Sequence, residues 1–217
     1  SLASIPQNEK PVVELFVMSY CPFGTQAEKA ALPALDALGD SVDFQLKFVD
    51  YAMHGAPEVE ENLREYAISQ KYPEKLLPYL NEFLESGDAD SALAAVEISE
   101  SELADVIAAA DAEFEISKNL DDESSWLHDS AGNPTFPLFL IHDADGDRYG
   151  VQGSPTFVIN GQLVESVPRN SATMLELFCA GFENAPDACS TELSTATPST
   201  GFGWDESDGA ASGGECS

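Results

Sequence analysis

Basic residues are scarce in this chain of 217 residues, which has 9 Lys and Arg against 39 Asp and Glu and a formal net charge of −30. A surface this acidic repels phosphate backbones and anionic lipid headgroups, so we expect neither nucleic acid nor a membrane surface as a partner. The acidic residues are spread along the whole chain rather than gathered in one block. This pattern favours an adaptation to high salt, where screening removes the self-repulsion, over an acidic surface that tunes the choice of partner.

Long apolar runs are also missing. No stretch approaches the ~20 apolar residues that span a bilayer, and residues 1–10 lack the apolar core of a signal peptide. The three histidines are scattered, and no group of Cys and His has the spacing of a zinc site. Asp143, Asp145 and Asp147 are spaced as in a calcium loop, but the glycine and the glutamate of that loop are not in their places. We therefore expect no membrane insertion and no metal.

Apolar residues are frequent enough for a packed core, since 43% of the chain is hydrophobic. The length suits one domain of ordinary size with an insertion and a tail. We expect a loose arm over residues 1–10 and a flexible, Ser/Thr/Gly-rich tail over residues 186–217.

Hydrophobic periodicity predicts a strand–helix–strand unit, then a block of three helices, then a hairpin followed by a helix. The predicted ranges are 10–19, 25–38 and 42–51 for the first unit, 57–70, 73–86 and 99–118 for the three helices, 156–159 and 163–166 for the hairpin, and 171–182 for the last helix. A strand–helix–strand unit of this length makes its two strands parallel. Asp88 and Asp90 are expected in a turn between helices, and residues 136–141 are apolar without a clear period.

Cys21 stands where the first strand passes into the first helix, in the stretch V-V-E-L-F-V-M-S-Y-C-P-F-G over residues 12–24. A helix N-terminus offers unpaired N–H groups and the positive end of the helix dipole, and both lower the pKa of a thiol. Pro22 suits the first helical position because the N–H that it lacks would have no partner there. These residues alone leave two interpretations open, a nucleophile and a buried structural cysteine.

Three further cysteines and one acid bear on the chemistry. Cys179 and Cys189 flank a proline bend, and we favour a structural disulfide that fastens the end of the chain, with two free thiols as the alternative. Cys216 lies near the end of the predicted tail, which would place its thiol on a mobile tether. Glu14 interrupts the first strand, either as a solvated residue at an edge or as a buried carboxylate that could shuttle protons to a thiol.

Two separated motifs resemble those of the thioredoxin superfamily. Residues 20–24, Y-C-P-F-G, resemble its active-site turn, and the Y-C-P-F portion looks like glutaredoxin; residues 153–156, G-S-P-T, resemble its cis-proline loop. The helical block between them is similar to that of DsbA-like proteins and of the gamma-interferon-inducible lysosomal thiol reductase group. The resemblance covers about residues 11–182. It implies an α/β, thioredoxin-like fold over residues 11–185 with a DsbA-like helical insertion at about 52–136.

The resemblance also implies roles for single residues. Cys21 would be the attacking thiolate, and a cis Pro155 with the backbone of Ser154 would hold an extended substrate segment. Glu14 would correspond loosely to the buried acid of DsbA-like proteins, although its distance from the cysteine along the chain differs. The substrate-binding residues that the resemblance implies are Pro22, Phe23, Gly24, Ser154 and Pro155.

The second cysteine of the C-x-x-C motif is missing, because Gly24 stands in its place. In a dithiol enzyme that cysteine attacks the mixed disulfide and releases the substrate. Four outcomes are open: a small thiol such as glutathione resolves the mixed disulfide, Cys216 resolves it, the protein isomerises disulfides with one thiol, or the redox activity is lost. The insert at 52–136 also lacks the cysteines that relatives in the lysosomal reductase group tend to carry there.

The resulting hypothesis is a monothiol-type thiol–disulfide oxidoreductase or isomerase that acts outside the cytoplasm on protein or small-molecule disulfides. It would need no bound cofactor, with glutathione as a candidate co-substrate. One alternative is a redox-inactive thioredoxin-fold module that binds peptides or has a structural role. Another is a glutathione-dependent enzyme similar to the kappa-class transferases. A low pKa of the Cys21 thiol would separate the first hypothesis from the second.

Overall fold

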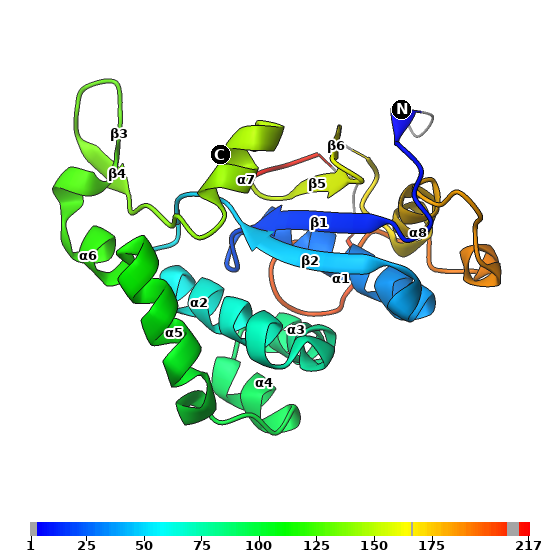
Figure 1. Cartoon of the computed structure of the whole chain (residues 1–217), viewed down its shortest axis with the longest axis horizontal. Helices are drawn as coiled ribbons and strands as arrows, with labels where there is room; N and C mark the ends of the chain where they lie inside the picture. The colour runs from blue at the N-terminus through cyan, green and yellow to red at the C-terminus, as the bar shows by residue number, and fades with distance from the viewer. Residues whose placement is uncertain (1–3, 166, 208–212) are drawn as a thin grey trace.

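A four-stranded sheet with the strand order β2-β1-β5-β6 forms the centre of the computed structural model, which describes residues 4–165, 167–207 and 213–217 (Figure 1). β1 runs parallel to β2 and antiparallel to β5, and β5 pairs with β6 as a hairpin. The parallel pair and the hairpin confirm the sequence predictions, although Ser166, the last residue of the predicted hairpin, lies outside the described residues. The strands of this sheet are β1 (Val12–Val17), β2 (Asp43–Phe48), β5 (Thr156–Ile159) and β6 (Gln162–Val164).

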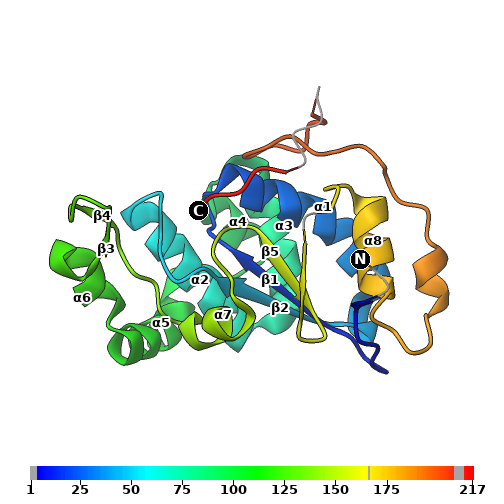
Figure 2. The ribbon, with the colours of Figure 1, turned by 90° about the horizontal axis from the view of Figure 1, so that it is seen from above.

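β1 is the central strand and is buried on both faces, as its near-continuous apolar sequence predicts. One face, with Leu15, joins the main core, which α1 and α8 cover from one side. The other face, with Phe16, joins a smaller core, and α7 lies over it through an edge contact between the rings of Phe16 and Tyr149. Figure 2 shows α1 and α8 on one side of the sheet and α7 on the other. These helices are α1 (Pro22–Leu38), α7 (Asp143–Tyr149) and α8 (Ser171–Cys179).

The predicted block of helices is inserted between β2 and α7 and packs beside the sheet (Figure 1). Its helices are α2 (Ala56–Lys71), α3 (Leu76–Ser86), α4 (Ala89–Ala95), α5 (Glu100–Phe114) and α6 (Ile116–Asp121), followed by the hairpin of β3 (Leu127–His128) and β4 (Pro134–Phe136). The helix predicted over 99–118 is divided at Glu115, whose φ of 52° is left-handed. Asp88, which we expected in a turn, caps α4 by accepting hydrogen bonds from the backbone of Asp90 and Ser91.

The calcium-loop spacing at residues 143–147 has a different explanation, because these residues form the short helix α7. Asp145 accepts a hydrogen bond from Lys47 at 2.6 Å and another from Arg148 at 3.0 Å, so its carboxylate forms two ion pairs with side chains of the protein. Within the described ranges, no group of three or more His, Cys, Asp and Glu side chains could hold a metal ion.

The predicted flexible tail differs from the structure in its described parts. Phe202 packs edge-on against Tyr20 and Phe83, and the buried Lys29 ammonium donates to the carbonyl oxygens of Ser199 and Gly203 at 2.7 and 2.6 Å. Such contacts use main-chain carbonyls and one aromatic ring, so the low apolar content of the segment did not reveal them. The tail therefore lies along the outer side of α1 (Figure 2).

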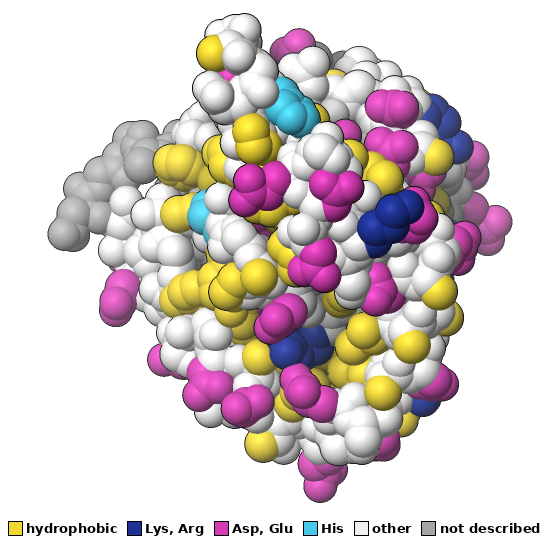
Figure 3. Space-filling model, turned by 90° about the vertical axis from the view of Figure 1, so that its left-hand side faces the viewer, with side chains coloured by type: hydrophobic (Ala, Val, Ile, Leu, Met, Phe, Trp, Pro, Cys, Tyr) yellow, Lys and Arg dark blue, Asp and Glu magenta, His cyan; other side chains and the backbone are white. Residues whose placement is uncertain are grey.

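Acidic side chains outnumber basic ones on the face of the molecule that carries the helical block. Figure 3 shows them scattered over this face, with few Lys and Arg among them. Among the residues that the structure describes, no helix is long and apolar enough to cross a membrane.

Candidate active site

Cys21 is the N-cap residue of α1, and the turn that carries it follows directly from β1. Its Sγ accepts a hydrogen bond from the Gly24 N–H at 3.3 Å, and Pro22 occupies the first turn of the helix. The side chain is fully buried. The unpaired N–H groups and the dipole of the helix therefore point at this sulfur, and they would stabilise a thiolate once the sulfur is reduced.

The loop before Cys21 is fixed from two sides. The Met18 N–H donates to the Ser154 hydroxyl at 2.9 Å, while the N–H groups of Ser19 and Tyr20 donate to side chains of α2. These acceptors on α2 are the Asn62 amide oxygen, at 3.1 Å, and the Glu58 carboxylate, at 2.9 Å. Burial raises the pKa of Glu58, and the charge of His54 opposes that shift.

The loop of residues 153–156 faces the turn that carries Cys21. Its Ser154–Pro155 peptide bond is cis, and Ser154 is fully buried. The carbonyl oxygen of Ser154 lies 3.4 Å from Cys21 Sγ. The two motifs, 133 residues apart in the sequence, are therefore in direct contact in the fold.

Gly24 stands where the C-x-x-C pattern has its second cysteine, and the space around it is filled. A Cβ atom on Gly24 would lie 2.6 Å from the Ser154 hydroxyl oxygen and 3.2 Å from the Met18 carbonyl oxygen. A cysteine at this position would therefore require Ser154 to move, and Ser154 is held by its hydrogen bond to Met18.

Cys21 is joined to Cys216 by a disulfide that bridges 195 residues of sequence. The backbone of Cys216 pairs with that of Ser154 as a short antiparallel bridge: the Cys216 N–H donates to the Ser154 carbonyl oxygen at 2.8 Å, and the Ser154 N–H donates to the Cys216 carbonyl oxygen at 2.9 Å. Cys216 is 8% exposed. The end of the chain thus covers Cys21 and lies against the cis-proline loop.

Phe23 and Arg169 complete the surroundings of the chain end. The Arg169 guanidinium lies over the Phe23 ring, 6.0 Å from its centroid, and donates to the Gly214 carbonyl oxygen at 2.6 Å. Burial lowers the pKa of Arg169, while the charge of Glu215 opposes the shift. No sequence motif pointed to Arg169, although it is one of only nine basic residues and lies between the hairpin and the last helix.

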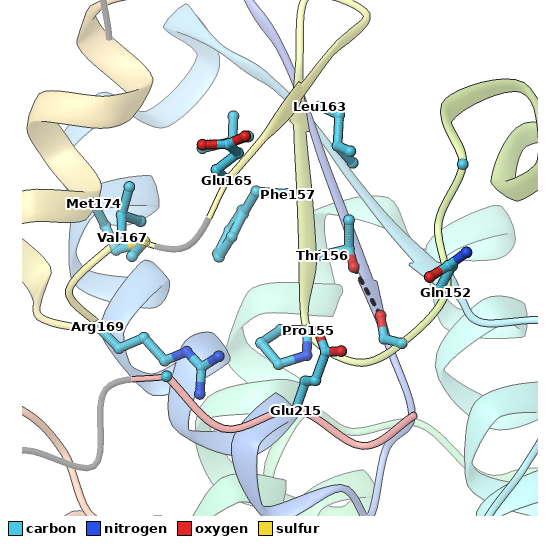
Figure 4. Close-up of a pocket in the computed structure, with 14 residues that line it drawn as sticks. Gln152, Pro155, Thr156, Phe157, Leu163, Glu165, Val167, Arg169, Met174 and Glu215 are labelled. Carbon is cyan, nitrogen blue, oxygen red and sulfur yellow. Dashed lines mark hydrogen bonds between the residues drawn. The ribbon is translucent and has the colours of Figure 1, made fainter. Parts of the chain in front are cut away.

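A cavity of about 250 Å³ adjoins the chain end beside the cis-proline. Figure 4 shows Pro155, Phe157, Arg169 and Glu215 around it, with Met174 from α8. Gly213 and Glu215 of the chain end also line it, so the cavity adjoins the groove between Phe23, residues 153–155 and Arg169 that the chain end occupies.

Glu14 is buried, at 3% exposure, on the central strand, so the interpretation as a solvated edge residue is wrong. Its carboxylate accepts a hydrogen bond from Lys47 at 2.6 Å, and the Tyr149 side chain also hydrogen bonds to it. Lys47 bridges onward to Asp145. The contacts of Glu14 therefore lead to β2 and α7, and the structure does not bring it into contact with Cys21. Glu58 and Asn62, which do hold the Cys21 loop, lie in a predicted helix whose sequence gave no signal of that role.

Cys179 and Cys189 form the second disulfide, across 10 residues. It joins the end of α8 to the short 3-10 helix at Asp187–Ser190 and takes no part in the surroundings of Cys21.

No family model and no curated protein matches the chain. Solved structures do match it. The reduced form of DsbA from Mycobacterium tuberculosis has a TM-score of 0.54 and 13% identity, with 86% of this chain and 92% of that chain covered. The reduced form of the disulfide bond oxidoreductase DsbG from the same organism has a TM-score of 0.55 and 12% identity, covering 86% and 87%. At this identity the likeness shows the fold: an α/β, DsbA-like thioredoxin fold with a helical insertion, as the sequence motifs predicted.

Proposed function

We propose that this protein is a thiol–disulfide oxidoreductase whose redox pair consists of Cys21 and Cys216. The observation that carries the proposal is the disulfide between a cysteine at a helix N-terminus and a cysteine held beside the cis-proline loop. By its motif the enzyme is of the monothiol type, and its second thiol comes from the far end of the chain. Its substrates are protein or small-molecule thiols and disulfides.

In the reducing direction, the Cys21 thiolate attacks one sulfur of a substrate disulfide, and the other substrate sulfur leaves as a thiolate. The Cys216 thiolate then attacks Cys21 Sγ, which releases the second substrate thiolate and forms the Cys21–Cys216 disulfide. The substrate gains two electrons and the cysteine pair loses two. The same steps in reverse oxidise a substrate dithiol.

The site supports this exchange through the leaving group as well as through the nucleophile. When a thiolate attacks Cys216 Sγ, or the substrate sulfur of the mixed disulfide, Cys21 is the leaving group, and its sulfur becomes a thiolate that the Gly24 N–H and the start of α1 can stabilise. In this mechanism Glu14 has no role in proton transfer to or from Cys21, because the side chains that contact Glu14 are those of Lys47 and Tyr149.

We also propose that the protein works outside the cytoplasm, in an oxidising compartment. The support is its two disulfides, of a kind that persists where no thiol pool keeps cysteines reduced.

Catalysed reduction of a protein disulfide by dithiothreitol tests the function. The natural chain should turn over, and Cys21→Ser should abolish turnover. At limiting dithiothreitol, Cys216→Ser should accumulate a mixed disulfide at Cys21 and turn over about tenfold more slowly or worse, because the intramolecular resolving step is lost and only an external thiol can open that disulfide. The matched control is the double variant Cys179→Ala with Cys189→Ala, which should keep its activity.

The thiol pKa supplies the outcome that would contradict the proposal. In the reduced protein, the alkylation rate of Cys21 at about pH 6 should exceed that of a free thiol with a pKa of ~8.5. If it does not, Cys21 is no activated nucleophile, and a redox-inactive module is the better interpretation. If added glutathione fully restores turnover to Cys216→Ser, a small thiol can replace Cys216 as the resolving group.

A further inference from the structure

The last residues of the chain, 213–217, lie in the site in the way that an extended peptide would. Cys216 exchanges two main-chain hydrogen bonds with Ser154, and Arg169 holds the main-chain carbonyl of Gly214. These three hydrogen bonds involve only backbone atoms of the chain end. Any extended segment with a cysteine in the same register could make them, as in peptide binding by strand addition.

The same chain end covers the nucleophile. Cys21 is fully buried and its partner Cys216 is 8% exposed, so a substrate segment can reach Cys21 only after residues 213–217 leave the groove. The chain end is thus both the redox partner and an occupant of the surface on which a substrate must lie.

One position of the bound segment has no room for a side chain. A Cβ atom on Gly214 would overlap the Phe23 ring, so the ring or the bound segment would have to shift. The neighbouring Gly213 differs, because a Cβ atom there would have no atom of the described residues within 4 Å. The side chain at position 215 lines the cavity beside Pro155, so this position accepts larger groups (Figure 4).

We infer that the groove formed by Phe23, residues 153–155 and Arg169 binds extended protein segments in which a glycine precedes the reacting cysteine by two residues, and that residues 213–217 are its intramolecular occupant. This inference rests on the proposed function, since the bound segment is taken to exchange disulfides with Cys21. It adds the substrate class, and it makes the chain end a competitor of the substrate.

The test uses the full chain with Cys216→Ser and short peptides whose cysteine carries thionitrobenzoate. The Cys21 thiolate attacks the peptide sulfur, the Cys21–peptide disulfide forms, and thionitrobenzoate leaves with the electron pair of the broken bond, which its absorbance reports. Three peptides are compared: Gly-Gly-Glu-Cys-Ser, which copies the chain end, Gly-Ala-Glu-Cys-Ser, and the matched control Ala-Gly-Glu-Cys-Ser.

Alanine two residues before the cysteine should lower the second-order rate constant by about tenfold or more, because overpacking against Phe23 opposes binding. Alanine three residues before it should change the rate by less than about twofold, since that position is open. The variant Phe23→Ala in the same background should remove most of the difference in rate between the first two peptides.

Equal rates for the first two peptides would overturn the inference while leaving the proposed function in place. If Cys21 fails to react even with dithionitrobenzoate, the symmetric aromatic disulfide that carries no peptide, the proposed function is wrong. The inference then fails with it.

A second measurement needs no change at Phe23. In the otherwise natural chain, Gly214→Ala should let dithiothreitol open the Cys21–Cys216 disulfide at about tenfold lower concentration, and Gly213→Ala should not. The Cys179–Cys189 disulfide serves as the internal reference. If the dithiothreitol concentration that opens half of the Cys21–Cys216 disulfide is the same in Gly214→Ala and Gly213→Ala, the inference is overturned.

Discussion

Glu28 lies inside the molecule on α1, seven residues after Cys21, and is only 3% exposed. One of its carboxylate oxygens has no hydrogen-bond partner among the residues that the structure describes. Burial, together with repulsion from Glu61, raises the pKa of Glu28 to about 8. Burial and the neighbouring acids Glu61 and Glu28 also raise the pKa of Glu65 well above its usual range. This part of the core therefore holds protons that the unfolded chain releases at neutral pH.

The sign of the resulting pH dependence follows from the pKa of Glu28. An unfolded glutamate has a pKa of about 4.3, so between this value and about 8 the folded state holds a proton that the unfolded state has lost. The contribution of Glu28 to the free energy of unfolding is present at low pH and is lost as the pH rises through about 8, by up to about 1.4 kcal/mol per pH unit for one proton.

Glu28→Gln removes this titration and keeps the shape of the side chain. We expect the variant to gain stability relative to the natural chain as the pH rises from about 5 to about 8. Urea unfolding across this range measures the difference, and Glu85→Gln on the exposed face of α3 is the control. Parallel pH profiles for the natural chain and Glu28→Gln would show that Glu28 ionises normally.

At the scale of elements, α1 is unusual in being covered on nearly all sides. Twelve of its 17 residues are buried, because the tail covers the surface that the sheet and α8 leave open. The Gln26 amide and the Lys29 ammonium both donate to tail carbonyls, at 2.9 and 2.7 Å for Pro198 and Ser199. Phe202 adds the apolar contact with Tyr20 and Phe83. The tail is thus fixed to the domain well before it reaches Cys21.

Phe202→Ala should loosen this attachment and reduce the effective concentration of Cys216 near Cys21. We expect dithiothreitol to open the Cys21–Cys216 disulfide at a concentration on the order of tenfold lower. Alkylation of quenched samples followed by mass spectrometry gives the midpoint, and the Cys179–Cys189 disulfide should stay at its original midpoint. Trp204→Ala, on the same segment but 37% exposed, is the matched control. An unchanged midpoint in Phe202→Ala would show that the tail anchor does not govern the redox pair.

At the scale of the whole molecule, the formal net charge is −30, and many of the acids behind it lie on the surface (Figure 3). Their mutual repulsion opposes the compact state, and salt screens it over a Debye length of about 3 Å at 1 M. The melting temperature should therefore be higher in about 1 M NaCl than in about 20 mM NaCl. As a control, this difference should shrink as the pH approaches the sequence pI of about 4.1, where the net charge falls. Equal melting temperatures in the two salts at neutral pH would contradict the expectation.

The sequence predicted those parts of the fold that local patterns encode. The apolar run of β1, the helix start at Cys21 and the hairpin of β5 and β6 all follow from periodicity and turn residues. The ion pair of Glu14 with Lys47 could not be predicted, because the packing of β2 and α7 on β1 creates it. The same holds for the course of the tail, whose contacts to Lys29 use main-chain carbonyls that every sequence has. Gly24 was recognised as a departure from C-x-x-C, but the closeness of Ser154 to this position exists only in three dimensions.

The sequence separation of 195 between Cys21 and Cys216 also sets an order of events during synthesis. At about 5–20 residues per second, the ribosome adds Cys216 about 10–40 s after Cys21. The segments that form the sheet, α1 and α8 all precede Cys216 in the chain, so the groove can form before its occupant exists. The Cys21–Cys216 disulfide therefore cannot close before synthesis has reached Cys216, and until it closes Cys21 is open to other thiols and disulfides.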